Sequence, residues 1–600
     1  MNTPSPLETA IRGDRGSQGG PLALFYGRYR WIICGLLLFA TTINYLDRQV
    51  ISYLKEFFCT SKDLGGFGWS NSNFADLTSF FTAFYAGMTV VAGWLIDKIG
   101  TKLGLALSLI IWSIFGIANA FVGPLLLMHV YIRSAFAVGE AGNFPASIKT
   151  VAEWFPKKER ALATGIFNAG SNVGAMIAAL LVPGCMVYFG DQRGWKMAFI
   201  ITGAVGFVWL IFWFAFYDTP AKQKRLSKAE FEYINGDQDN PVVAEKPDSG
   251  IAAKLFAFHG RLPRCAFWGT SILVVMLTVF ILLMTSLIVS GGAHLYMPGG
   301  GINHLIDVIW FTPNSSRAIL SARVICLAVA VWILASIQVR RWHDLDRPGW
   351  LVLLNLVPII GNVVSVAILG FGKGKGGENG FGPQGSPGLL GHRQTWSFFC
   401  GKMLTDGVWW FYLFWLPDYL QKQFQMTKQQ VTLPTFIVYG VAIVGSVYGG
   451  SIPMTFMKRG MPVYKARMTA MFLIALAPLA VLTTQYFGNV EHFGKMAAAL
   501  AVGTICIGAA AHQAWSANLF TTVSDMFPKR TVGSVTGIGT MAGGIGGVVI
   551  QQFAGGLTDA YKSTPQTAYM IMFVICGLSY LIAWSVIKAL VPQHKPITDL

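Results

Sequence analysis

The stretch Gly93-Trp94-Leu95-Ile96-Asp97-Lys98-Ile99-Gly100-Thr101-Lys102 joins two apolar runs, at residues 76–97 and 104–122. Gly93 allows two helices to approach closely because it has no side chain. Asp97 is placed either to cap a helix end or to pair with an Arg or Lys on the same side. Since both flanking runs are long enough to cross a bilayer, the stretch predicts a short loop between two membrane helices.

The composition of the whole chain is typical of a membrane protein. Of its 600 residues, 54% are hydrophobic and only 12% are charged, whereas soluble domains are about 25% charged. Apolar runs of about 20 residues recur along the chain. We expect the net charge of +17 to reflect Lys and Arg in loops on the inner side of a membrane, and not nucleic-acid binding. The sequence therefore predicts an all-α polytopic membrane protein.

The apolar runs outside the middle of the chain form two groups of six. The first group lies near 31–53, 76–97, 104–122, 125–149, 161–187 and 196–217, and the second near 397–418, 431–457, 466–486, 496–518, 533–557 and 568–590. Basic residues flank the even-numbered connections, which places both chain ends in the cytoplasm. Two bundles of six helices, 12 in all, with a site between them at mid-membrane, are expected.

These runs also predict how the chain is divided. The expected parts are a disordered cytoplasmic tail without a signal peptide (1–27), the first bundle (28–220), a cytoplasmic linker (221–254), an insert (255–385), a second linker (386–394), the second bundle (395–592) and a cytoplasmic tail (593–600).

The insert holds three further apolar segments, near 267–290, 319–338 and 350–371. Since both of its neighbours are expected in the cytoplasm, it must cross the membrane an even number of times. The first two segments then cross as a hairpin, with basic clusters on the inner side. The third is broken at Pro358 and Gly361 and is expected to be a re-entrant or interfacial hairpin. The whole chain would cross about 14 times.

Four ionisable side chains inside the first bundle are the main candidates for chemistry. Asp47 and Arg48 lie in the first run, and Arg133 and Glu140 in the fourth. A charge near the bilayer centre costs about 3 kcal/mol or more, so such residues are paired or line a cavity. Their depths predict that Asp47 meets Arg133, with Glu140 nearly two turns deeper on the same face. Making and breaking the carboxylate pairs of Arg133 would load and release a proton, and Arg48 would bind an anion. The alternative is a static salt-bridge network.

Other polar side chains are candidates for the lining of a pocket. Hydroxyl and amide groups that suit sugar hydroxyls are those of Tyr45, Tyr85, Asn168 and Asn172, and Gln513 and Ser516 are expected to face a cavity. Helix packing explains the first four, each taken alone, equally well. His512 is either part of the packing or a proton carrier. The aromatic run from Trp409 to Tyr412 suits the bundle core, an interfacial belt or stacking on a sugar ring.

Several functional classes are disfavoured by missing patterns. The chain has no GxxxxGK[ST] for ATP binding, no HExxH and no CxxC pair, and nothing suggests a nucleophile triad, haem or an iron–sulfur cluster. We therefore expect a protein that is not an enzyme and that holds no metal and no cofactor.

Together the motifs resemble the anion:cation symporter branch of the major facilitator superfamily, and above all its hexuronate transporter group. The stretches that carry the resemblance are 43–50 (INYLDRQV), 93–102, 139–146 (GEAGNFPA), 154–161 (WFPKKERA), 409–417 (WWFYLFWLP) and 511–528. The likeness covers roughly residues 28–220 and 395–590.

This resemblance implies a proton-coupled symporter of a bacterial inner membrane that imports a sugar acid, such as galacturonate or glucuronate, by alternating access. The bilayer, protons and the anion are its implied partners. The proton-coupling residues would be Asp47 and Glu140, and the gating loop would be formed by Gly93, Asp97, Lys98, Gly100 and Lys102. The implied substrate-binding residues are Arg48, Arg133, Tyr45, Tyr85, Asn168, Gln513, Trp515, Ser516 and Asn518.

The insert departs from that family. Its stretches GRLPR (260–264), RRWHD (340–344), PGW (348–350) and NGFGP (379–383) resemble a small bacterial YhaH-like membrane domain of unknown function. We expect His343 and Asp344 to form a structural cluster rather than a site. The insert would regulate the movement of the bundles or recruit an unknown partner.

Other activities are compatible with these residues. Relatives in the resembled branch carry aldonates, other organic anions or phthalate-like acids, so the anion stays open. An exporter of small anions and a membrane sensor of sugar acids that signals through the insert are the remaining alternatives.

Overall fold

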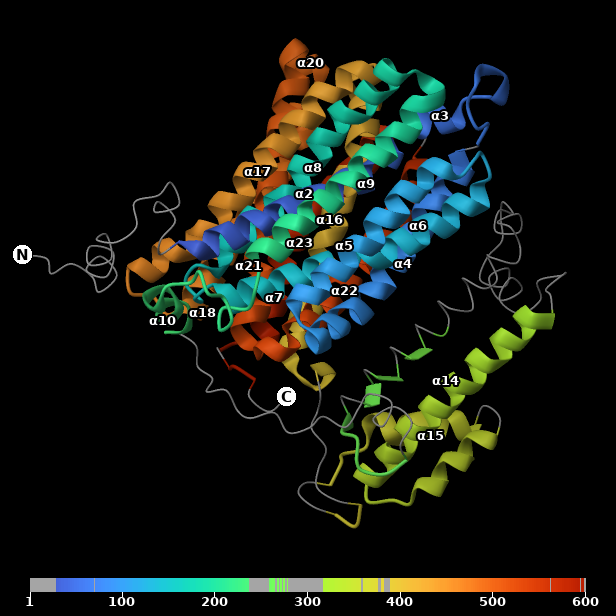
Figure 1. Ribbon diagram of the computed structural model, residues 1–600, viewed down its shortest axis with the longest axis vertical. Helices are drawn as coiled ribbons and strands as arrows, with labels where there is room; N and C mark the ends of the chain where they lie inside the picture. The colour runs from blue at the N-terminus through green and yellow to red at the C-terminus, as the bar shows by residue number, and fades with distance from the viewer. Residues whose placement is uncertain are drawn as a thin grey trace, which may run out of the picture. The chain divides into compact units, whose positions relative to one another are not determined.

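The computed structural model describes residues 28–236, parts of 258–278, 317–381 and 389–597, with gaps at 70, 358–359, 376–378, 562 and 594. The chain divides into two units, Met1–Asp239 with Ser397–Ile597 and Asn240–Trp396 with Thr598–Leu600. Nearly all described residues lie in helices, so the all-α prediction is confirmed (Figure 1). The predicted tail 1–27 and most of the first insert segment lie outside the described residues.

The first half of unit 1 follows the six predicted apolar runs. Its main helices are α2 (Tyr29–Tyr53), α4 (Asn71–Ile99), α5 (Thr101–Ala118), α6 (Leu126–Glu140), α7 (Asn143–Trp154), α8 (Arg160–Phe189) and α9 (Asp191–Phe216). The fourth predicted run is split into α6 and α7. Pro145 has no N–H to donate to the carbonyl of Ala141, so the hydrogen-bond ladder is interrupted at this point.

The second half of unit 1 repeats this plan. Its main helices are α16 (Arg393–Phe424), α17 (Lys428–Lys458), α18 (Val463–Leu476), η7 (Ala477–Thr483), α19 (Thr484–Phe487), α21 (Ala497–Met526), α22 (Val532–Ala560) and α23 (Pro565–Leu590). Eleven helices of the described chain are long and apolar enough to cross a membrane, and one of these, Arg323–Asp344, belongs to unit 2. The split fourth run and α16 are outside that set, and α16 carries Lys402 and Asp406 within its apolar run.

Small residues let the two halves of unit 1 pack closely. Helix α8 lies against α17, and α4 lies against α22. A Cβ added at Gly165 would come within 2.2 Å of the Ser446 carbonyl, and one at Gly537 within 2.3 Å of the Thr89 carbonyl. Such close approach is typical of helices packed in membranes.

The described part of the predicted linker contains a helix. Helix α10 (Lys228–Asn235) belongs to unit 1. Glu230 accepts hydrogen bonds from the backbone N–H groups of Tyr29 (3.0 Å) and Arg30 (3.2 Å), and it pairs with the Arg30 side chain at 2.8 Å. A carboxylate from α10 therefore satisfies the free N–H groups at the start of α2.

Unit 2 contains α14 (Arg317–Asp344), η5 (Gly349–Leu356) and α15 (Ile360–Phe371). Its small core includes Phe267, Ile337, Trp342 and Leu369. The third predicted apolar segment is indeed divided, into η5 and α15, at the expected break. Its course relative to the membrane stays a prediction.

Candidate functional site

A cavity of about 110 Å³ lies between the two halves of unit 1. The first half contributes Tyr45, Arg48, Tyr85, Arg133 and Asn168 to its wall, and the second half contributes Lys402, Asp406, Trp409, Trp410, His512, Gln513, Ser516 and Phe520. The wall therefore combines cations, hydrogen-bonding groups and aromatic rings from both halves.

Arg48 is the best-positioned cation of this wall. Its Nε donates to Glu140 Oε2 at 3.0 Å, and its guanidinium lies 4.4 Å from the Tyr85 ring and 4.8 Å from the Tyr45 ring. The Nη2 atom is buried and has no hydrogen-bond partner among the described residues. One carboxylate and two rings thus fix the guanidinium, and one of its donors is left for a ligand.

The predicted pairing of Arg133 with a carboxylate is wrong in this structure. Its Nη2 donates to the Arg48 carbonyl at 3.3 Å, and its guanidinium lies 4.6 Å from the Phe136 ring. Glu140 pairs with Arg48 instead. Successive residues on a helix point about 100° apart, so Asp47 and Arg48 point in different directions, and it is Arg48 that reaches Glu140 on α6.

Asp47 is buried without a partner. Its side chain is 2% exposed, and neither carboxylate oxygen has a hydrogen-bond partner within the described residues. An ionised carboxylate in such surroundings is costly, whereas a protonated one is tolerated. The position is therefore chemically suited to carrying a proton.

Two charged residues of the cavity were not identified from the sequence. Lys402 Nζ lies 2.6 Å from Asp406 Oδ2 on α16 and 4.2 Å from the centre of the Phe520 ring. Both charges fall inside an apolar run, which is the same signal that revealed Asp47. That signal was sufficient to find them.

Most of the expected substrate-binding residues reach the cavity, but two do not. Asn168 Nδ2 donates to Gln513 Oε1 at 2.7 Å and so links the two halves. Trp515 packs against Tyr580 instead, at 5.6 Å between ring centres. Asn518 donates to the Gly449 carbonyl at 2.9 Å. Neither lines the cavity, because both lie on a different face of α21 from Gln513.

The stretch 93–102 forms the end of α4, the turn at Gly100 and the start of α5, and it joins the two halves at one end of unit 1. Asp97 accepts hydrogen bonds from the backbone N–H of Gly533 (3.1 Å) and Ser534 (2.6 Å) at the start of α22, and it pairs with Lys149 at 2.9 Å. A carboxylate stabilises a helix N-terminus in this way. Elsewhere in the stretch, Lys102 pairs with Asp218 at 3.1 Å.

Gly450 of the second half makes a similar close contact with the first half. A Cβ at Gly450 would come within 2.3 Å of the Ala161 carbonyl. Nearby, Arg467 pairs with Asp525 at 2.6 Å, and Arg160 donates to the Ser524 carbonyl at 2.5 Å. The Gly450–Ala161 and Arg160–Ser524 contacts join the halves, whereas the Arg467–Asp525 pair lies within the second half.

Gly93→Ala is expected to push α4 away from the start of α22. A Cβ at Gly93 would come within 2.2 Å of the Gly533 carbonyl, and overpacking of this kind costs about 2 kcal/mol. We expect a Tm several degrees lower in detergent. In the matched control Gly35→Ala, also in a membrane helix, the new Cβ meets no atom within 4 Å, so its Tm should stay near that of the unchanged protein. Equal Tm values for both variants would contradict the close packing.

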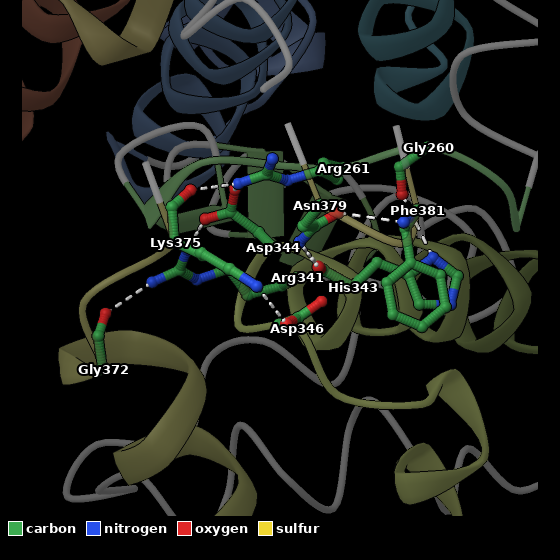
Figure 2. Close-up of polar contacts among 10 residues, drawn as sticks. All are labelled: Gly260, Arg261, Arg341, His343, Asp344, Asp346, Gly372, Lys375, Asn379 and Phe381. Carbon is green, nitrogen blue, oxygen red and sulfur yellow. Dashed lines mark hydrogen bonds and ion pairs between the residues drawn. The ribbon is translucent and has the colours of Figure 1, made fainter. Parts of the chain in front are cut away.

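A second polar cluster lies in unit 2 and joins three of the stretches that carry the insert's resemblance (Figure 2). Asp344 accepts from Arg261 at 3.1 Å and also from Arg341. The His343 ring stacks on Phe381 with 4.1 Å between centres, and its Nδ1 lies 3.1 Å from the Gly260 carbonyl. These groups are occupied by contacts within the unit, which supports the structural interpretation.

Asp344→Asn is expected to destabilise unit 2. Removing one partner from a buried charge cluster costs about 3 kcal/mol or more. Hydrogen–deuterium exchange of the whole protein should therefore show faster exchange in 258–264 and 369–375. The control Asp346→Asn breaks the exposed pair with Lys375, whose hydrogen bond lowers the pKa of the Asp346 carboxyl, and it should change little. Unchanged exchange in Asp344→Asn would show that the cluster does not hold the unit together.

Groups of three or more His, Cys, Asp or Glu that suit a metal ion are absent from the described part of the chain. The wall of the cavity combines three cations and the carboxylate of Asp406 with hydrogen-bonding groups and aromatic rings.

Comparison with known proteins identifies a family that this chain matches. The family model of the Major Facilitator Superfamily matches residues 37–374. The hexuronate transporter of Escherichia coli (strain K12) is 36% identical over 248 residues, which are 40% of this chain and 55% of that protein. The galacturonate transporter of Dickeya chrysanthemi is 34% identical over 247 residues, 40% of this chain and 66% of that protein.

Other relatives extend over more of the chain. The matches above span about half to two thirds of those relatives' lengths. The D-galactonate transporter of Escherichia coli O6:H1 is 20% identical over 559 residues, 93% of this chain and 96% of that protein. A solved structure of the proton:xylose symporter XylE bound to 6-bromo-6-deoxy-D-glucose has the same fold, with a TM-score of 0.54, 12% identity and coverage of 95% and 98% of the two chains.

Proposed function

Because this chain belongs to the Major Facilitator Superfamily, we propose that it is a secondary transporter that imports a sugar acid together with protons. A hexuronate such as galacturonate or glucuronate is the proposed substrate. The hexuronate and galacturonate transporters among its relatives support this choice. An aldonate is the second candidate, since the D-galactonate transporter aligns with most of the chain.

The observation that carries the proposal is the position of Arg48. Its guanidinium lines the cavity between the halves, is fixed by Glu140 and aromatic rings, and keeps a donor without a partner among the described residues. A guanidinium held this way suits the planar carboxylate of a sugar acid. Aromatic rings such as Trp409 suit the apolar face of a sugar ring.

The charges around the cavity favour coupling to protons. Three cations and one carboxylate line it: Arg48, Arg133, Lys402 and Asp406. Two further buried carboxylates lie next to Arg48, Glu140 as its ion-pair partner and Asp47 as its neighbour in sequence. When all are ionised their sum is zero, and a bound monoanion adds one uncompensated negative charge. A surplus charge within a membrane is costly. One proton taken up by a carboxylate restores neutrality, and Asp47 is the proposed carrier because it lacks donors.

The packing of the halves supports alternating access. We assign the end where Asp97 contacts α22 and Arg467 donates to the Lys157 carbonyl to the cytoplasmic side of a bacterial inner membrane, where both termini would also lie. Protonation and substrate binding would together loosen these contacts and let the halves rock. We keep for unit 2 the proposal that it regulates this movement or recruits a partner.

A panel of acids tests the proposed substrate. Purified protein in proteoliposomes loaded with unlabelled acid should exchange it for labelled galacturonate. Galacturonate or glucuronate inside should drive faster exchange than galactonate, and phthalate should drive none. Exchange driven best by galactonate would favour the aldonate, and exchange driven by no sugar acid would contradict the proposal.

A further inference from the structure

The cavity contains an ion pair that belongs to a single helix. Lys402 and Asp406 are 2.6 Å apart and one turn apart on α16, with side chains only 5% and 17% exposed. Other buried pairs of unit 1 join different helices: Arg48 with Glu140 joins α2 to α6, and Arg467 with Asp525 joins α18 to α21. A pair within one helix holds no two elements together. A structural role therefore does not account for the cost of burying it.

The surroundings of the pair fix it against the wall of the cavity. A Cβ at Gly543 would come within 2.2 Å of Asp406 Oδ2, so α22 backs the carboxylate closely. Phe520 covers the ammonium of Lys402 at 4.2 Å. Both charged residues nevertheless line the cavity. Their remaining donors and acceptors are available on its side.

Trp409 and Trp410 extend this wall along the same helix. The Trp409 ring is held by stacking on His512, with 5.0 Å between centres and 7° between planes. A rigid aromatic surface beside a charged pair is suited to a ligand with an apolar face and a polar edge. A sugar ring has both.

The chemistry of the pair is matched to hydroxyl groups. A hydroxyl both donates and accepts hydrogen bonds, whereas a carboxylate only accepts them. Asp406 offers acceptors, and the ammonium of Lys402 has three donors, one of which faces Asp406. A ligand carboxylate at this place would be repelled by Asp406. The hydroxylated end of a ligand would instead be bound strongly, because one partner of each hydrogen bond is charged.

We propose that Lys402 and Asp406 form the hydroxyl subsite of the cavity and make transport selective for sugar acids with one carboxylate over sugar diacids. This proposal rests on the proposed function and adds which end of the substrate lies where. Arg48 binds the single carboxylate, and Lys402 and Asp406 of α16 bind the hydroxyl groups. A diacid would bring its second carboxylate toward Asp406, and like charges placed together oppose binding.

The test measures selectivity in the full-length protein. Uptake of labelled galacturonate into proteoliposomes gives its KM, and inhibition by the unlabelled diacid galactarate gives an inhibition constant. Asp406→Asn keeps the shape of the side chain and removes its charge. The inhibition constant of galactarate divided by the KM of galacturonate should then fall about tenfold, because galactarate binds relatively better. Asp406→Glu keeps the charge and should keep the ratio. The matched control is Asp418→Asn, since Asp418 pairs with Lys422 one turn away on the same helix, is more exposed and does not line the cavity.

Each outcome bears on the proposal. A ratio in Asp406→Asn equal to that of the unchanged protein, or an unchanged protein that prefers galactarate, would overturn the hydroxyl subsite while leaving sugar-acid transport intact. Should Asp406→Asn not fold, Asp406→Ser also removes the charge and must show the same fall. Failure of the unchanged protein to take up or bind either acid would contradict the proposed function itself.

Discussion

Replacing Arg48 with Gln is expected to lower kcat/KM for galacturonate uptake by about 100-fold, because the charged partner of the substrate carboxylate is lost. Gln keeps one amide donor but neither the charge nor the fork of the guanidinium. The loss should appear mainly in KM, since Arg48 is proposed to hold the substrate before the halves move. Initial uptake rates over a range of galacturonate concentrations measure it.

A double variant separates binding from structure. Arg48→Gln also leaves Glu140 buried without its partner, which alone destabilises a protein. Arg48→Gln with Glu140→Gln removes both charges and should restore the Tm toward that of the unchanged protein. If Arg48 binds the substrate, uptake stays low in the double variant. Uptake restored along with the Tm would show that Arg48 only balances Glu140.

Replacing Asp47 with Asn is expected to abolish accumulation against a gradient and to leave exchange of galacturonate intact. Asn has nearly the same shape but cannot carry a proton. With one proton per substrate, an inward pH difference of one unit drives about tenfold accumulation by the unchanged protein. In Asp47→Asn the internal concentration should not exceed the external one.

The control for Asp47→Asn is the same change at a carboxylate outside the cavity. Asp418→Asn should accumulate galacturonate normally, since Asp418 is partly exposed, pairs with Lys422 and does not line the cavity. Accumulation by Asp47→Asn equal to that of Asp418→Asn would rule out Asp47 as the proton carrier. Loss of exchange as well as accumulation would show that Asp47 is needed for more than coupling.

Most helices that the structure describes in unit 1 could be predicted because long apolar runs leave few alternatives to membrane helices. The break between α6 and α7 could also have been predicted, because Pro145 has no N–H for the hydrogen-bond ladder of a helix. Helix α10 was not predicted because it lies in a polar linker. Its Glu230 is fixed by the start of α2, about 200 residues away in sequence, and such a contact leaves no local pattern.

The candidate site was predictable in composition but not in pairing. Charges in apolar runs revealed Asp47, Arg48, Arg133 and Glu140. Which carboxylate meets which guanidinium depends on the rotation of each helix about its axis, and approximate depths do not supply this. The same rotation places Gln513 at the cavity and turns Trp515 away.

The most direct test of the whole account is uptake of labelled galacturonate into proteoliposomes with and without an inward proton gradient, at zero membrane potential. The account predicts that the label rises above its external concentration only while the gradient lasts. Uptake that is the same with and without the proton gradient, or no uptake by protein that still binds the acid, would contradict proton-coupled transport. The second of these results would favour a membrane sensor of sugar acids.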